Sequence, residues 1–249
     1  MSNYTSNDII NAIAAAAKAL EARKDEINRL NVFPVPDGDT GTNMSLTLAM
    51  VVDNLAKLPI GASSEDRRRA ITTGALMGAR GNSGVITSQI MRGLCEGIAD
   101  HEEFDIVAVD DAFSRAVEVA FNAVRKPVEG TILTVLRDTA TAAHKARKKK
   151  MELDEGLQFI VGESYASVQR TPELLPVLKE NGVVDAGGFG IAIFFDSFVA
   201  SLTGRAEAMV DELAFARTAA PKVEIEQIND WEGSKYKYCN EFLVNSETL

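Results

Sequence analysis

Apolar residues recur at the spacing of an α-helix along almost the whole chain up to about residue 205, and this pattern constrains the fold more than any other feature. The segments with this spacing are 7–29, 42–58, 64–77, 83–99, 106–126, 131–150, 153–171, 173–181 and 190–202. Alternating runs of β-branched residues are absent from this part of the sequence, and aromatic residues make up only 6% of the chain. We therefore predict an all-α fold with about eight amphipathic helices.

The character of the sequence changes after residue 204. Residues 205–235 begin rich in alanine and acidic side chains, are broken by Pro221 and then lose helical periodicity, which is typical of a linker. In residues 236–249 aromatic and branched side chains alternate with polar ones, as in a β-strand. A lone strand cannot satisfy its own backbone hydrogen bonds. We therefore interpret residues 1–204 as the helical domain and residues 236–249 as the truncated start of a further domain.

Composition argues against several classes of protein. The formal net charge of -10 disfavours binding to nucleic acid, because the phosphate backbone would be repelled. No uninterrupted apolar run approaches the roughly 20 residues that span a bilayer, so no integral membrane segment is expected. The N-terminus lacks the pattern of a secretory signal, and Cys95 and Cys239 are too few for a disulfide framework. These features predict a cytoplasmic protein.

The strongest candidate for a functional site is the segment 36–44, which reads Pro-Asp-Gly-Asp-Thr-Gly-Thr-Asn-Met. It places Asp37 and Asp39 in a glycine-relieved turn directly before a predicted helix. The two carboxylates can converge on one point, and such hard oxygen ligands suit Mg²⁺, which completes its shell with waters and substrate phosphates. Backbone N–H groups at a helix start suit phosphate oxygens. The alternative interpretation is an ordinary helix start with routine capping residues.

Three further glycine-rich segments precede predicted helices. Residues 78–84 consist mainly of small residues but match neither the dinucleotide fingerprint nor the P-loop. Residues 126–134 turn a rigid proline corner, and residues 184–190 again set an acidic side chain, Asp185, ahead of glycines. Each segment alone could be a simple turn or cap. Four such helix starts exceed what connectivity needs, and in a bundle they could gather at one end, which favours a shared binding site.

Taken together, these segments resemble the nucleotide-binding domain shared by the ATP-binding subunit of dihydroxyacetone kinases and the large subunit of bacterial fatty acid kinases. Residues 30–44, 77–84, 126–134 and 182–188 carry the likeness, which runs from the N-terminus to about residue 204. The second family is the closer match, because Thr40 stands where the dihydroxyacetone kinase subunits have histidine. The resemblance implies an up-and-down α-helical barrel that binds ATP or ADP and two Mg²⁺ ions across one end.

The resemblance also assigns roles by motif position. Asp37 and Asp39 would be the metal-binding, catalytic carboxylates, and Asn31 is the nearest match to a further metal ligand, one residue out of register. The residues expected at the nucleotide follow the same motifs and are Gly41, Thr42, Asn43, Gly81, Asn82, Ser83, Gly84, Thr131, Asp185, Gly187 and Gly188.

For function, the resemblance implies a kinase that phosphorylates the carboxylate of a fatty acid held by a separate acyl-binding protein, giving an acyl phosphate. Such a chain would take part in lipid metabolism, and it would bind nucleotide but turn over poorly without its missing region. The alternatives are the nucleotide subunit of a dihydroxyacetone-type kinase, a nucleotide-sensing module without transfer activity, and a helical scaffold without nucleotide affinity. The sequence leaves a homodimer open.

Overall fold

The computed structural model describes residues 4–205, which fold entirely into helices and the turns between them. The helices are α1 (Ser6–Ala22), α2 (Lys24–Arg29), α3 (Thr40–Ala56), α4 (Ser64–Gly78), α5 (Gly81–Gly97), α6 (Ile106–Ala123), α7 (Ile132–Lys148), α8 (Leu153–Leu174), α9 (Pro176–Asn181) and α10 (Ala186–Thr203). Two of them, α2 and α9, have only 6 residues. The predicted all-α fold with about eight principal helices is confirmed.

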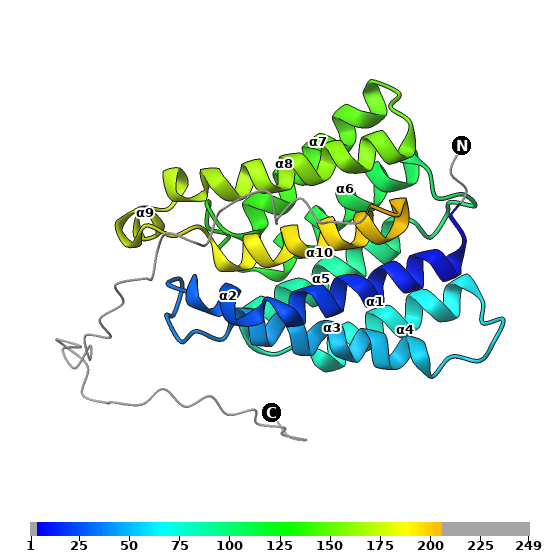
Figure 1. Ribbon diagram of the computed structural model, residues 1–249, viewed down its shortest axis with the longest axis horizontal. Helices are drawn as coiled ribbons and strands as arrows, with labels where there is room; N and C mark the ends of the chain where they lie inside the picture. The colour runs from blue at the N-terminus through cyan, green and yellow to red at the C-terminus, as the bar shows by residue number, and fades with distance from the viewer. Residues whose placement is uncertain (1–3, 206–249) are drawn as a thin grey trace, which may run out of the picture.

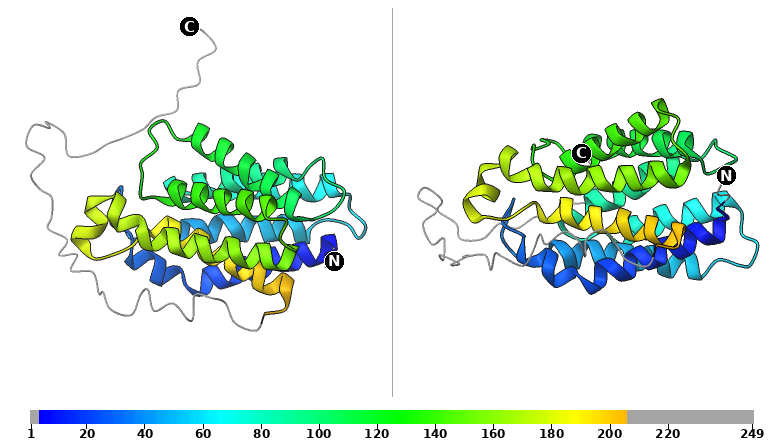
Figure 2. Two further views of the ribbon diagram at one scale, coloured as in Figure 1. Left: turned by 90° about the horizontal axis from the view of Figure 1, so that it is seen from above. Right: turned by 45° about the horizontal axis from the view of Figure 1, so that its top comes forward.

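The eight long helices form a closed ring in which each packs against the next (Figures 1 and 2). The order around the ring is α1, α3, α4, α5, α6, α7, α8 and α10, and α10 packs against α1 to close it. Successive long helices run in opposite directions (Figure 1). The N-terminal ends of α3, α5, α7 and α10 therefore lie together at one end of the barrel, the end that also carries α2 and α9.

Several helix boundaries differ from the predicted ones. The segment predicted as one helix over 7–29 is divided at Arg23 into α1 and α2. The predicted break before residue 173 is wrong, because α8 continues through Pro172 to Leu174. A proline cannot donate a backbone hydrogen bond, and here the Thr171 hydroxyl donates one to the carbonyl of Val168 (2.6 Å), the group that Pro172 cannot reach.

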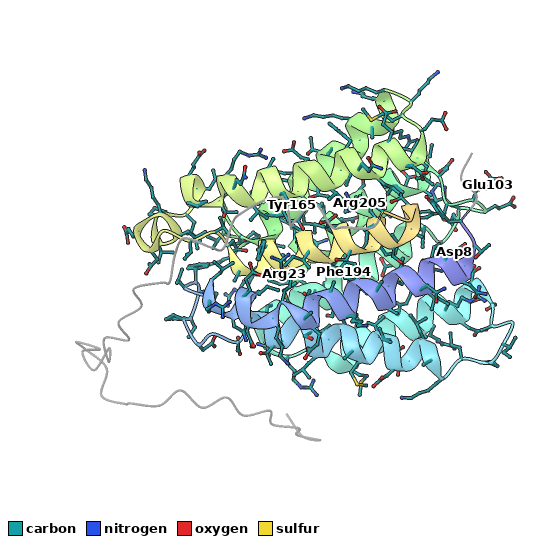
Figure 3. All side chains as sticks on the ribbon, in the orientation of Figure 1. Asp8, Arg23, Glu103, Tyr165, Phe194 and Arg205 are labelled. Atoms are coloured by element: carbon teal, nitrogen blue, oxygen red, sulfur yellow. The ribbon has the colours of Figure 1, made fainter. Side chains whose placement is uncertain are left out.

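The last helix, α10, supplies much of the barrel core. It is long and apolar enough to cross a membrane by length and composition, but 67% of that segment is buried within the barrel. Asp196 interrupts its apolar sequence and is fully buried, where it forms an ion pair with Arg205 and accepts a hydrogen bond from the Tyr165 hydroxyl (3.1 Å). Tyr165 and Arg205 are labelled in Figure 3. Because α10 packs between α1 and α8 in the barrel, its apolar composition is that of a buried core helix.

Two parts of the predicted domain organisation fall beyond this barrel. Residues 206–235, nearly all of the predicted linker, and the strand predicted for 236–249 lie outside the described residues. Within the described part, α10 ends at Thr203 and is capped by Gly204, where the sequence changes character. The division into a domain, a linker and a further domain stays a prediction.

Candidate functional site

A cleft of about 550 Å³ lies at the end of the barrel where α3, α5, α7 and α10 begin. Its walls come from the loop 31–39, the first turns of α5 and α7, the loop 124–131 and the start of α10. The predicted site residues that line it are Asn31, Asp37, Asp39, Gly81, Asn82, Ser83, Thr131, Asp185 and Gly187. All four glycine-relieved segments, which are far apart in the sequence, thus contribute to one cavity.

Asn31 organises the loop that carries the two aspartates. Its amide nitrogen donates to the carbonyl of Val35 (2.7 Å), and its amide oxygen accepts from both the backbone N–H (3.2 Å) and the hydroxyl of Thr40. The residue is only 6% exposed. Because both lone pairs of the amide oxygen are engaged, the structure gives Asn31 a positioning role. Its predicted role as a metal ligand stays a prediction.

Asp37 and Asp39 both face the cleft from this loop. Partial burial, the neighbouring Asp39 charge and a hydrogen bond between the two side chains all raise the pKa of Asp37. Repulsion of this kind is relieved when a divalent cation binds between two carboxylates. The described residues contain no cluster of three or more His, Cys, Asp or Glu side chains that could hold a metal alone. The pair therefore fits a Mg²⁺ ion that takes its other ligands from water and phosphate.

The first turn of α3 is capped from α2 by Asn28, a residue that the sequence analysis missed. Asn28 Oδ1 accepts hydrogen bonds from the N–H groups of Gly41 (2.8 Å) and Thr42 (3.2 Å), and its Nδ2 donates to the Thr42 hydroxyl (3.0 Å). Gly41, Thr42 and Asn43 do not line the cleft. The contacts span 13 and 14 residues, so no local sequence pattern indicates them.

The start of α5 presents backbone N–H groups to the cleft. The residue before it, Arg80, makes no side-chain cap, and within residues 4–205 the N–H groups of Gly81, Asn82 and Ser83 have no hydrogen-bond acceptor. Gly81 has a φ of 57°, and a Cβ there would lie 2.4 Å from Nδ2 of Asn43. Free N–H groups at the positive end of a helix dipole suit an anionic ligand. Gly84 does not line the cleft and instead packs against α3.

Asp185 is the N-cap of α10 and joins it to the start of α7. Its carboxylate accepts hydrogen bonds from the N–H groups of Gly188 (2.6 Å) and Ile132, and the residue is 5% exposed. Burial raises the pKa of Asp185 to about 7, against the opposing effect of these two hydrogen bonds. A Cβ at Gly188 would lie 2.7 Å from Cγ2 of Val135, so this glycine allows α10 to pack closely on α7. Gly188 itself does not line the cleft.

We expect Asp185→Asn to change the pH dependence of stability. The pKa of Asp185 rises from an ordinary value of 3.8 to about 7 on folding, so the folded state binds more protons between these values. The free energy of unfolding of the parent therefore falls as the pH rises through this window. The variant has no such charge, and its stability relative to the parent should increase by about 2–3 kcal/mol between pH 5 and pH 8.

Urea unfolding at both pH values measures this change. Asp100→Asn is the control, because it makes the same substitution at an exposed position at the other end of the barrel. An equal difference between Asp185→Asn and the parent at pH 5 and pH 8 would contradict the prediction.

Comparison with known proteins adds three similarities in sequence. Residues 34–200 match the family profile of the DAK2 domain. The chain is 40% identical to "Uncharacterized protein SH1689" of Staphylococcus haemolyticus over 236 residues and to "Uncharacterized protein SAR1202" of Staphylococcus aureus over 237 residues. Each alignment covers 93% of this chain but only 42% of the relative. The chain therefore spans about two fifths of the length of these relatives.

Among solved structures, the barrel is similar to the dihydroxyacetone kinase from C. freundii in complex with AMP-PNP and Mg²⁺. The TM-score is 0.58 at 16% sequence identity, and the match covers 80% of this chain and 34% of that chain. The native form of the same kinase gives a TM-score of 0.57 at 15% identity. At this level of identity the comparison establishes a shared fold, the barrel with its helix starts at one end.

Proposed function

Because the chain belongs to the DAK2 domain family, we propose that the cleft at the end of its barrel binds ATP or ADP with Mg²⁺, as the nucleotide-binding domain of a kinase. The observation that carries this proposal is the composition of the cleft. One cavity combines the Asp37 and Asp39 carboxylates with the N–H groups at the start of α5, which have no acceptor within residues 4–205. Metal-binding carboxylates beside a phosphate-binding helix start are the groups that phosphoryl transfer needs.

The roles of the residues follow from their contacts. Asp37 and Asp39 would hold Mg²⁺, and the bound ion would neutralise charge on the phosphates. The N–H groups of residues 81–83 would bind phosphate oxygens. Thr131, Asp185 and Gly187 also line the cleft and would lie near the rim of the nucleotide. Five other predicted site residues do not line the cleft and would contribute indirectly, by packing the helix starts together. These residues are Gly41, Thr42, Asn43, Gly84 and Gly188. We propose that the cleft binds a second Mg²⁺ ion together with the nucleotide.

The acceptor that we propose is the carboxylate of a fatty acid presented by a separate acyl-binding protein. A carboxylate oxygen would take the γ-phosphoryl group of ATP, giving ADP and an acyl phosphate. The motifs in residues 30–44 support this branch, as does Thr40, whose hydroxyl bonds to Asn31 where a dihydroxyacetone kinase subunit would carry histidine. The relatives are longer than this chain, which leaves room in them for a further domain. A cytoplasmic location and a homodimer remain part of the proposal.

Calorimetric titration of ATP and ADP, with and without Mg²⁺, tests the nucleotide site. We expect Mg²⁺-dependent binding by this chain and by the full-length Staphylococcus haemolyticus relative. Absence of binding by both proteins would overturn the proposal. Formation of ADP by the full-length relative is then measured with a fatty acid on an acyl-binding protein and with dihydroxyacetone on its binding subunit. Turnover with the second acceptor alone would favour the dihydroxyacetone alternative, and binding without any turnover would favour the sensing module.

A further inference from the structure

We propose that Arg125 and Lys126 bind the terminal phosphates of the nucleotide from the side of the cleft opposite Asp37 and Asp39. This inference rests on the proposed function and adds two binding residues to it. Segment 126–134 resembles a family motif, but the resemblance assigned a role only to Thr131 in this part of the chain. Arg125 lies outside that segment altogether.

The cleft carries few positively charged side chains. Arg125 and Lys126 are the only Arg or Lys side chains among the described residues that line it. Both are exposed, and neither makes an ion pair or a side-chain hydrogen bond within residues 4–205. The guanidinium groups of Arg137 and Arg170, by contrast, are engaged by carboxylates. In a chain with a formal net charge of -10, two adjacent cations without a carboxylate partner are available to an anionic ligand.

The loops that carry the aspartates and the two cations lie on opposite sides of the barrel. The loop 31–39 leads into α3 and the loop 124–131 leads into α7. In the order of packing around the barrel, α3 and α7 stand four places apart in a ring of eight, so they lie on opposite sides. A polyphosphate in the cleft would therefore meet carboxylates that suit Mg²⁺ on one side and two cations on the other. Its negative charge would be neutralised from both sides.

Hydrogen bonds hold the loop 124–131 in place. The Glu129 carboxylate accepts hydrogen bonds from Nη1 (2.6 Å) and Nη2 (2.8 Å) of Arg137 and from the Thr134 hydroxyl (2.8 Å). The Thr131 hydroxyl donates to the carbonyl of Val128 (2.8 Å). Pro127 restricts the backbone of the preceding Lys126 to extended conformations. The backbone that carries the cations is thus ordered before a ligand arrives, which lowers the entropic cost of binding.

The test measures the affinities of ATP, ADP and AMP in Mg²⁺ for the parent chain, Arg125→Ala, Lys126→Ala and the double variant. ATP and ADP are titrated by calorimetry, and AMP by competition. We expect each single substitution to weaken ATP binding about tenfold and the double substitution about a hundredfold, as for lost charge-assisted hydrogen bonds. AMP binding should change less than twofold. Lys57→Ala is the matched control, because it removes the same charge at an exposed position at the far end of α3.

Each result has a distinct meaning. If the parent fails to bind any nucleotide, the proposed function fails and takes this inference with it. If the parent binds and the double variant binds ATP equally well, only the inference is overturned. An equal loss of ATP and AMP affinity would also overturn it, because the loop would then support the nucleoside instead of the terminal phosphates. Circular dichroism and urea unfolding establish that the variants are folded.

Discussion

Replacing Asp37 or Asp39 by alanine is expected to abolish Mg²⁺-dependent nucleotide binding while the barrel stays folded. Each substitution removes one of the two carboxylates that the loop 31–39 directs into the cleft. Even the loss of a supporting group around a metal commonly costs 10–100-fold in metal affinity, so the loss of a ligand should weaken nucleotide binding by about a hundredfold or more. Calorimetric titration of ADP with and without Mg²⁺ measures the effect.

The stability of the Asp37→Ala and Asp39→Ala variants should not fall together with their affinity for nucleotide. The neighbouring Asp39 charge contributes to the raised pKa of Asp37, so the pair repels in the absence of a cation. Removing either charge relieves that repulsion, and we expect the free energy of unfolding without Mg²⁺ to stay equal or increase slightly. Residues that cost stability in the free protein and are required for the ligand are typical of functional sites.

Asp53→Ala is the matched control for charge. Asp53 is exposed on the same helix, α3, near its other end, and its removal lowers the negative charge by the same amount. It should leave ADP affinity unchanged. Tight Mg²⁺-dependent binding of ADP by Asp37→Ala and Asp39→Ala would contradict the prediction. It would indicate that other residues hold the metal. A loss of binding that accompanies unfolding would be uninformative about the site, so Asp37→Asn, which keeps the shape of the side chain, is measured alongside.

The features of this fold that could be predicted from the sequence are those that depend on neighbouring residues. Helical periodicity identifies the eight long helices, because their buried faces repeat every three to four positions. Alternation of direction then brings every second helix start to one end, so the gathering of four glycine-relieved segments follows from connectivity alone. The first and last residues of the helices are less predictable. The glycines of 187–190 suggested a loop, yet they lie inside α10 because the Asp185 side chain caps its first turn.

The features that the sequence did not predict depend on partners distant in the chain. Asn28 caps α3 from the end of another helix, and nothing in its surroundings distinguishes it from an exposed asparagine. Gly41 and Gly84 resemble phosphate-binding glycines in the sequence, but the structure places them where helices touch. The sequence does not single out Arg125 and Lys126 as a pair; the structure does, because they are the only Arg or Lys side chains among the described residues that line the cleft.

The largest loss of stability is expected for Gly41→Ala. A Cβ at this position would lie 2.3 Å from the backbone oxygen of Lys24 and 3.0 Å from both Cβ of Ile27 and Oδ1 of Asn28. A backbone oxygen inside α2 cannot swing aside as a flexible side chain can, so α2 and α3 must separate. That separation breaks the Asn28 cap and exposes Ile27, which is fully buried. We expect the free energy of unfolding to fall by about 3 kcal/mol or more.

Gly162→Ala is the control for this prediction, because it is the same substitution at an exposed position within α8 with no atom within 4 Å of the added Cβ. There the better helix propensity of alanine should stabilise the protein by about 0.5–1 kcal/mol. Urea unfolding of both variants measures the two opposite effects. If Gly41 were needed only for contact with phosphate, Gly41→Ala would lose nucleotide affinity at unchanged stability. That result would contradict the packing role that the structure gives this glycine.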